Sequence, residues 1–250
     1  MYPKYSYPPD VIIGLIRDAI LSRQRVFRMD ARASISRLDP PLRIFHPENI
    51  PQSGPFVITV NHYYRPGFAA QWMALAISAV VPENIHWIIT GELTFPGKWY
   101  APLGMLVSRF ILERGARVYG FTTMPPMPPR PRDVEARAAS VRAVLDSIRH
   151  TENPIIGLAP EGGDQLGGVL TMPASGVGRF ALLLAKRHLR FVPVGIYETG
   201  GELCLNFGEA YNLSVPHNLS ADERERAAAR IIMKNIAVLL PVQLRGEFSN

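Results

Sequence analysis

Cysteine is nearly absent from the sequence, since Cys204 is the only one among 250 residues. A single cysteine cannot form a disulfide within the chain, and it gives a cysteine-based metal cluster too few ligands. The histidines do not replace it, because none of the six lies in a His-x-x-x-His or similar pattern. We therefore expect a protein compatible with a reducing compartment and without a metal site.

Long apolar runs are also missing. No stretch approaches the ~18–20 apolar residues that a membrane-spanning helix needs. The first ten residues are rich in tyrosine and proline, and no apolar segment typical of a signal peptide follows them. The sequence therefore predicts a cytoplasmic protein that is soluble or lies peripherally on a membrane.

Charged residues are few, at 19% of the chain, whereas apolar residues reach 47%. This composition is typical of a globular protein, and the length suits one domain with an appendage. The formal net charge of +6 permits an anionic membrane, a nucleic acid or a negatively charged substrate as partner, and by itself it selects none. The three tryptophans are too scattered for a base-stacking platform, so we do not expect a nucleic-acid partner.

Apolar β-type runs alternate with helical patterns along most of the chain. The segments predicted as strands are residues 42–45, 56–60, 86–90, 116–121, 154–159, 191–196 and 203–207. Those predicted as helices are residues 68–80, 98–112, 133–150, 173–188 and 222–240. Such alternation indicates an α/β fold with a mostly parallel central sheet flanked by helices. Residues 122–132 contain five prolines, which predict an extended or flexible connector.

The N-terminal segment, residues 1–40, is expected to be helical and to precede an α/β domain at residues 41–250. Apolar side chains recur near helical spacing at Ile12, Ile13, Ile16, Ile20 and Phe27. Between residues 17 and 37 there are six arginines and only two acidic residues. A basic amphipathic helix of this kind can lie on an anionic membrane surface. Packing on the α/β core with an exposed basic face is the alternative.

Three stretches follow or interrupt predicted strands near the sheet edge where ligands gather in α/β proteins. They are Asn61-His62, the glycine-rich GLAPEGGDQLGG at residues 157–168, and FVPVGIYE at residues 191–198. The glycine-rich stretch lacks the Lys-Ser/Thr of a nucleotide-binding loop, but its glycines let backbone approach a ligand closely. His62 is therefore either a histidine hydrogen-bonded to backbone at a strand end or a catalytic base.

Three short motifs, taken in order, carry a resemblance to a known family. Asn61-His62, Pro160-Glu161-Gly162 and Val192-Pro193-Val194 resemble the first, third and fourth motifs of the lysophospholipid (glycerolipid) acyltransferases, over roughly residues 50–215. The resemblance implies an enzyme that moves a fatty acyl group from acyl-CoA or acyl-carrier protein to a hydroxyl group of a lipid-like acceptor. It also implies a role in lipid metabolism, such as phospholipid biosynthesis, with the thioester as co-substrate and no resident cofactor.

The resemblance further implies roles for individual residues. His62 would be the general base that takes the proton of the acceptor hydroxyl, a task that suits a histidine near pH 7. Glu161 would act beside it by helping to bind the acceptor, while Gly162 keeps the backbone close. The other residues expected to contact substrate are Asn61, Arg65, Arg117, Pro160, Gly163, Asp164 and Pro193.

One departure from the family pattern concerns the partner of the histidine. Gly67 stands five residues after His62, where the family has an aspartate that orients the imidazole. Replacing the orienting aspartate of a serine protease by asparagine costs roughly 10⁴ in turnover. Another carboxylate must therefore substitute if His62 is a base, and the candidates are Asp164, Glu161 and Glu92.

A second departure concerns phosphate binding. Aligning Gly115 with the glycine of the family's second motif puts Phe121 in place of an arginine, and a small shift would make Arg117 its counterpart. In the third motif Asp164 replaces another arginine, which exchanges attraction to a phosphate for repulsion. Arg65 is the only obvious local replacement. We therefore expect a neutral or differently charged acceptor, such as a glycolipid or a lipid alcohol, rather than a simple glycerol phosphate.

Three functions remain open from the sequence. The chain is an acyltransferase, a catalytically impaired relative that binds lipid or an acyl chain, or a thioester hydrolase in which water replaces the acceptor. A carboxylate within ~2.6–3.2 Å of the His62 ring would favour an enzyme, because a base needs an orienting partner. An apolar or backbone-only environment would favour the binding protein.

Overall fold

The strands form one seven-stranded sheet in the computed structural model, which describes residues 2–95, 97–127, 130–164 and 166–249. Their order is β1-β7-β6-β2-β5-β3-β4. The strands are β1 (Arg43–Phe45), β2 (Phe56–Val60), β3 (His86–Thr90), β4 (Thr122–Met124), β5 (Ile155–Leu158), β6 (Arg190–Thr199) and β7 (Glu202–Phe207). Neighbouring strands are parallel except β6 and β7, which pair antiparallel. The predicted α/β fold with a mostly parallel sheet is confirmed.

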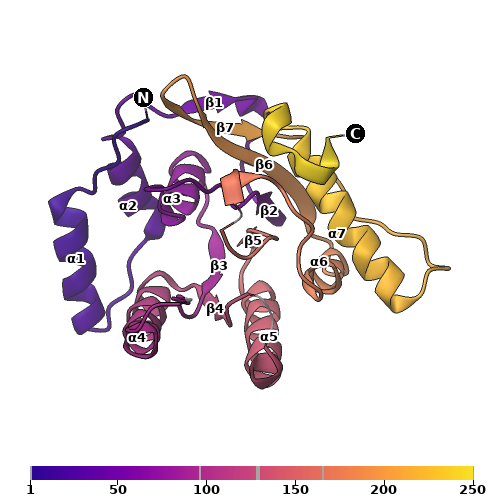
Figure 1. Cartoon of the computed structure of the whole chain (residues 1–250), viewed down its shortest axis with the longest axis horizontal. Coiled ribbons are helices and arrows are strands. Elements are labelled where there is room, and N and C mark those ends of the chain that lie inside the picture. Colours follow the sequence, from indigo (N-terminus) through magenta and orange to yellow (C-terminus); the bar gives the residue numbers. More distant parts are fainter. Residues whose placement is uncertain (1, 96, 128–129, 165, 250) are drawn as a thin grey trace.

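Helices cover both faces of the sheet (Figure 1). They are α1 (Pro9–Ile20), α2 (Phe27–Ile35), α3 (Gln71–Val80), α4 (Ala101–Tyr119), α5 (Val134–His150), α6 (Val177–Ala185) and α7 (Ala221–Ala237). In Figure 1, α2, α3 and α4 lie on one side of the strands, whereas α5, α6 and α7 lie on the other. Right-handed crossovers account for this division, because the chain steps outward from β2 to β4 and then returns through β5 to β6.

The centre of the sheet is built from apolar strands that are buried on both faces. Val57 and Ile58 of β2 and Ile156 of β5 have no exposed surface, as expected for central parallel strands under two layers of helices. Gly157 interrupts β5 for a packing reason, since a Cβ atom there would lie 2.3 Å from the ring of Trp87. The absence of a side chain lets that indole cross the strand.

The prediction of a strand at residues 116–121 is wrong. Helix α4 continues to Tyr119 and ends at Gly120, which has a φ of 69° and closes the helix in the left-handed conformation. A short apolar run does not distinguish a strand from the last turn of a helix. The strand that follows, β4, lies inside the proline-rich segment, which is therefore not entirely a connector; Pro128 and Pro129 lie outside the described residues.

The N-terminal segment contains two helices instead of the one expected between residues 10 and 27. Arg25 lies between them and links them, because its guanidinium binds Asp18 of α1 at 2.7 Å and Asp30 of α2 at 2.6 Å. The hydroxyl of Tyr119 donates to Asp30 at 2.8 Å. This buried charged cluster ties both helices to α4.

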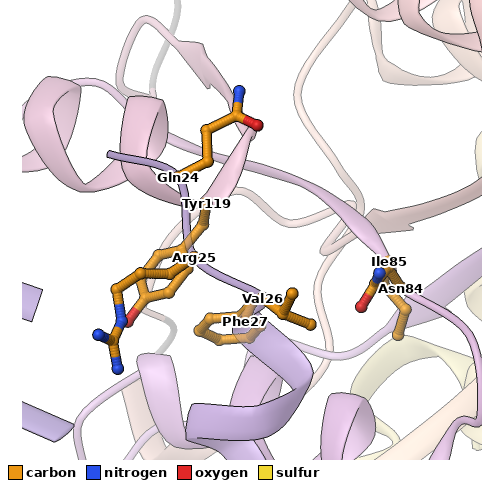
Figure 2. A pocket seen from close by; sticks show the side chains of 7 residues that line it. All are labelled: Gln24, Arg25, Val26, Phe27, Asn84, Ile85 and Tyr119. Carbon is orange, nitrogen blue, oxygen red and sulfur yellow. The ribbon is translucent and has the colours of Figure 1, made fainter. Parts of the chain in front are cut away.

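A cavity of about 260 Å³ lies beside this charged cluster (Figure 2). Figure 2 shows residues of the α1–α2 connection on one side of it and Asn84 and Ile85 on the other. Those two residues precede β3, so the cavity lies near the amino end of that strand.

None of the described helices is long and apolar enough to cross a membrane.

Candidate active site

The site forms where two central parallel strands end side by side. β2 and β5 pair with Thr59 opposite Leu158, so the residues that follow each strand emerge at the same edge of the sheet. His62 follows β2, and the turn containing Pro160, Glu161 and Gly162 follows β5. The topology therefore brings together the first and third motifs, which lie about 100 residues apart in the sequence.

The backbone of this edge is fixed by two buried polar side chains. Asn61 has no exposed surface, and its amide donates to the carbonyl of Ile196 at 2.9 Å and accepts from the N–H of Ile196 at 2.7 Å. Glu161 is 5% exposed and accepts hydrogen bonds from the N–H groups of His62 at 2.7 Å and Thr171 at 3.1 Å. Both side chains hold the histidine-bearing loop.

The imidazole of His62 has a carboxylate beside it. Its Nδ1 lies 3.3 Å from Oδ1 of Asp164, while the side chain of His62 is 14% exposed and that of Asp164 is 56% exposed. The contact is an ion-pair distance without good hydrogen-bond geometry, because Nδ1 has no hydrogen-bond partner among the described residues. Of the three candidate orienters, Asp164 is the one that reaches the ring. Gly163 lies on the same turn.

Burial shifts the protonation of both buried groups at this edge. It lowers the pKa of His62 from its ordinary value because it disfavours the imidazolium, and the charge of Asp164 partly offsets this effect. Burial raises the pKa of Glu161 to about 7, against the hydrogen bonds from His62 and Thr171 that lower it. A neutral imidazole near pH 7 is the form that can accept a proton.

An apolar cavity of about 130 Å³ opens beside the Pro160–Gly162 turn. Pro160 and Gly162 line it together with Met127 of the proline-rich segment and Phe180 of α6. Gly162 has a φ of 68°, and a Cβ atom there would lie 2.6 Å from Cγ of Met127. Glycine at this position therefore permits both the turn and the close approach of the methionine. The guanidinium of Arg137 donates to the carbonyls of Pro125 and Pro126.

Arg65 is not free to hold a substrate phosphate. Its guanidinium binds Glu198 at the end of β6 through two contacts, one of them 2.8 Å long from Nη2 to Oε1. The hydroxyls of Tyr5 and Tyr63 also donate to Glu198, at 2.6 and 3.0 Å. The side chain of Glu198 is 2% exposed and that of Arg65 is 14% exposed. The ring of Tyr2 lies 3.9 Å below the guanidinium. This cluster fastens the N-terminal residues to the loop after His62.

The remaining predicted residues lie away from the imidazole. Arg117 is exposed near the carboxyl end of α4, which leads to the amino end of β4 and thus to the opposite sheet edge. Glu92, the third candidate orienter, binds Arg130 at 2.8 Å instead. Pro193 lies within β6 just before the β7 ladder begins at Val194, where a missing N–H breaks no hydrogen bond with that strand. It is not among the residues that line the apolar cavity.

The sequence interpretation missed Glu198, although its acidic side chain directly follows an apolar strand. The strand end was visible, but the buried partner of Arg65 depends on β6 lying beside β2. Among the described residues, no group of three histidine, cysteine, aspartate or glutamate side chains could hold a metal ion.

Comparisons with known proteins agree with this arrangement. No curated protein matches the sequence. The fold is similar to that of the 1-acyl-sn-glycerophosphate (LPA) acyltransferase PlsC from Thermotoga maritima, with a TM-score of 0.52 and 12% sequence identity over 92% of this chain and 90% of that one. At this identity the likeness shows a shared fold alone. Residues 42–197, more than half of the chain, match the family model described as Acyltransferase. The chain therefore belongs to the acyltransferase family, which includes the lysophospholipid acyltransferases that its motifs resemble.

Proposed function

We propose that this protein is an O-acyltransferase that moves a fatty acyl group from acyl-CoA or acyl-carrier protein to a hydroxyl group of a lipid-like acceptor. The observation that carries the proposal is the 3.3 Å contact between Nδ1 of His62 and Asp164 at the carboxyl edge of the sheet. With Nδ1 directed at the carboxylate, Nε2 is the nitrogen available to the acceptor. His62 is then the general base.

The reaction follows from this arrangement. Nε2 of His62 takes the hydroxyl proton as the acceptor oxygen attacks the thioester carbonyl, and a new C–O bond forms. The resulting oxyanion collapses with cleavage of the C–S bond, and the departing sulfur takes the proton from the imidazolium. Asp164 stabilises the positive charge that the ring carries between the two steps. Glu161 holds the loop through the His62 N–H and is a positioning residue.

The apolar cavity beside Gly162 is the proposed site of the acyl chain. It lies next to the turn that carries Asp164, and its lining is mainly apolar. Met124 and Met127 of the proline-rich segment form part of the wall, and methionine adapts well to a flexible chain. A bound acyl chain would place its thioester toward the Pro160–Gly162 turn.

The acceptor is proposed to be a lipid-like alcohol without a phosphate near the reacting hydroxyl. Arg65 and Arg130 already have carboxylate partners, since Arg65 binds Glu198 and Arg130 binds Glu92 and Asp133. Arg137, which lines the apolar cavity, donates to the carbonyls of Pro125 and Pro126. Asp164 adds negative charge beside the base and disfavours a phosphate there. Acylation of lysophosphatidate as fast as of a neutral lysolipid or lipid alcohol would contradict this part of the proposal.

The protein is further proposed to work at an anionic membrane surface. Helix α1 leaves Ile13, Ile16 and Ile20 exposed, at 66, 55 and 69%. Arg17 lies on the same helix with 61% of its side chain exposed. Exposed isoleucines beside a cation are typical of a helix that lies in the plane of a membrane. A peripheral position would give the enzyme direct access to lipid acceptors.

The main alternative is a catalytically impaired relative that binds lipid or an acyl chain. The observation in its favour is the geometry at Nδ1, since Asp164 is exposed and does not form a well-shaped hydrogen bond with the ring. Catalytic hydrogen bonds commonly tighten when substrate binds, and a 3.3 Å contact is close enough for Asp164 to become the orienting partner of the ring. The two functions differ in whether a thioester is cleaved.

Thiol release from a long-chain acyl-CoA, with and without lipid-alcohol acceptors, tests the proposal. We expect acceptor-dependent release that His62→Ala abolishes and that His150→Ala, a change at an exposed histidine of α5, leaves intact. Release that depends on His62 but not on the acceptor would identify a hydrolase. Saturable acyl-CoA binding without release, also with acyl-carrier protein as donor, would identify a binding protein.

A further inference from the structure

Helix α4 has its apolar side turned to solvent. Large apolar residues recur on it at helical spacing and are strongly exposed: Leu103 at 66%, Leu106 at 67%, Val107 at 50%, Phe110 at 65% and Ile111 at 60%. Trp99, just ahead of the helix, is 92% exposed. A helix that packs on a sheet normally buries this stripe. An apolar face of this size on a soluble protein marks an interaction surface.

The side of α4 that faces the protein is small and polar by comparison. Its buried residues are Ser108, Ala116 and Val118. The hydroxyl of Ser108 accepts from the N–H of Leu93 at 3.0 Å and donates to the carbonyl of Met105 at 3.0 Å. The packing of α4 therefore does not use its apolar stripe, which remains available.

The stripe of α4 approaches the exposed isoleucines of α1. Nε of Arg114 donates to the carbonyl of Ala19 at 2.8 Å, and the same guanidinium lies 6.0 Å from the ring centroid of Phe110. Ala19 directly precedes Ile20, which is 69% exposed. Arg114 thus connects Phe110 of α4 with the end of α1, and both helices lie on the same side of the sheet (Figure 1).

Exposed cations accompany this apolar face. They are Arg17 and Arg23 on and after α1, and Lys98, Arg109 and Arg117 on and before α4. The exposed acidic residue of the two helices is Asp10. Arg109 pairs with the half-buried Glu113 and Arg17 with the buried Asp18, each at 2.9 Å. Apolar side chains with basic neighbours match the acyl region and anionic headgroups of a lipid bilayer.

We propose that α4, together with α1, is a membrane-docking face that inserts its apolar stripe into an anionic bilayer. A second copy of the chain is a poorer occupant, because both copies would bring the same basic face to the contact. The amino end of α4 follows β3, so the stripe begins at the sheet edge where His62 lies. Docking through α4 would bring that edge to the lipid.

Vesicle flotation tests this surface without requiring catalysis, so its result is independent of the proposed acyl transfer. The probe is a vesicle of equimolar phosphatidylcholine and phosphatidylglycerol. Leu106→Ser with Phe110→Ser should weaken binding at least about tenfold, since each lost side chain removes apolar burial. Val134→Ser with Val238→Ser is the matched control, because those valines are 64 and 66% exposed on and after other helices.

Tryptophan fluorescence supplies a second measurement. Trp72 and Trp87 are buried at 3 and 4% exposure, so Trp99 is the tryptophan that reports on contact with lipid. We expect a blue shift with these vesicles that added salt diminishes. Wild-type protein that ignores the vesicles, or α4 double-variant protein that binds them like the control, would overturn the proposal. A stable dimer that the α4 changes dissociate would also overturn it, since the face would then bind protein.

Discussion

The sharpest test of the site is the replacement Asp164→Asn, which removes a charge and keeps the shape of the side chain. At the observed 3.3 Å, two unit charges attract by about 1 kcal/mol in water and about 5 kcal/mol at an effective dielectric constant near 20. Because 56% of the Asp164 side chain is exposed, solvent screening holds the value near the lower limit, at about 1–2 kcal/mol. The maximal rate should therefore fall roughly 5- to 30-fold.

The pH dependence of the same variant gives the sign of the effect. A base must be neutral to act, so the rate rises with pH through the pKa of His62. Asp164 raises that pKa against the lowering caused by burial, and its removal should therefore move the acid limb to lower pH. Steady-state thiol release between acid and neutral pH measures both effects, with Asp146→Asn on the exposed side of α5 as control. An unchanged plateau and an unmoved acid limb would refute the orienting role of Asp164.

Three further outcomes are expected. Arg65→Met should lower the free energy of unfolding in urea by roughly 3 kcal/mol or more, because it leaves the buried Glu198 charge without its counter-ion and with only the hydroxyls of Tyr5 and Tyr63 as donors. The double change with Glu198→Gln, which removes the charge and keeps an oxygen for those hydroxyls, should recover much of that loss; equal losses would contradict the ion-pair account. The free energy of unfolding should fall by up to about 3 kcal/mol as pH rises from about 4.5 to 7. The reason is that Glu161 keeps its proton to about pH 7 in the native protein, whereas the unfolded chain releases it at lower pH. A Glu161→Gln variant whose stability falls equally over this pH range would locate the effect elsewhere. Val141→Trp should fill the apolar cavity and shift the preferred thioester to shorter acyl chains, and an unchanged preference for a long chain would place the acyl group outside it.

The sequence was sufficient for six of the seven strands and for the edge that carries the site. β2 and β5 were recognisable because strands buried on both faces are continuous apolar runs, and the polar residues after them had to meet where parallel strands end. It was insufficient at residues 116–121, where a few apolar residues fit the last turn of α4 as well as a strand. The exposure of the apolar stripe on α4 could not be predicted for a related reason. Periodicity identifies an apolar helix face but does not show whether other parts of the protein cover it.

Local sequence by itself determined most of the strands and helices, and it located His62, Glu161 and Asp164 after strand ends. Tertiary structure alone decided which charged groups meet. The sequence alone left Arg65 as a candidate for binding a phosphate. In the structure β6 places Glu198, which is 133 residues away in the sequence, beside Arg65. Asp164 became the partner of His62 because β5 lies next to β2. The physical reason is that a side chain's partner depends on strand order and burial, and both arise from contacts between segments that are distant in the sequence.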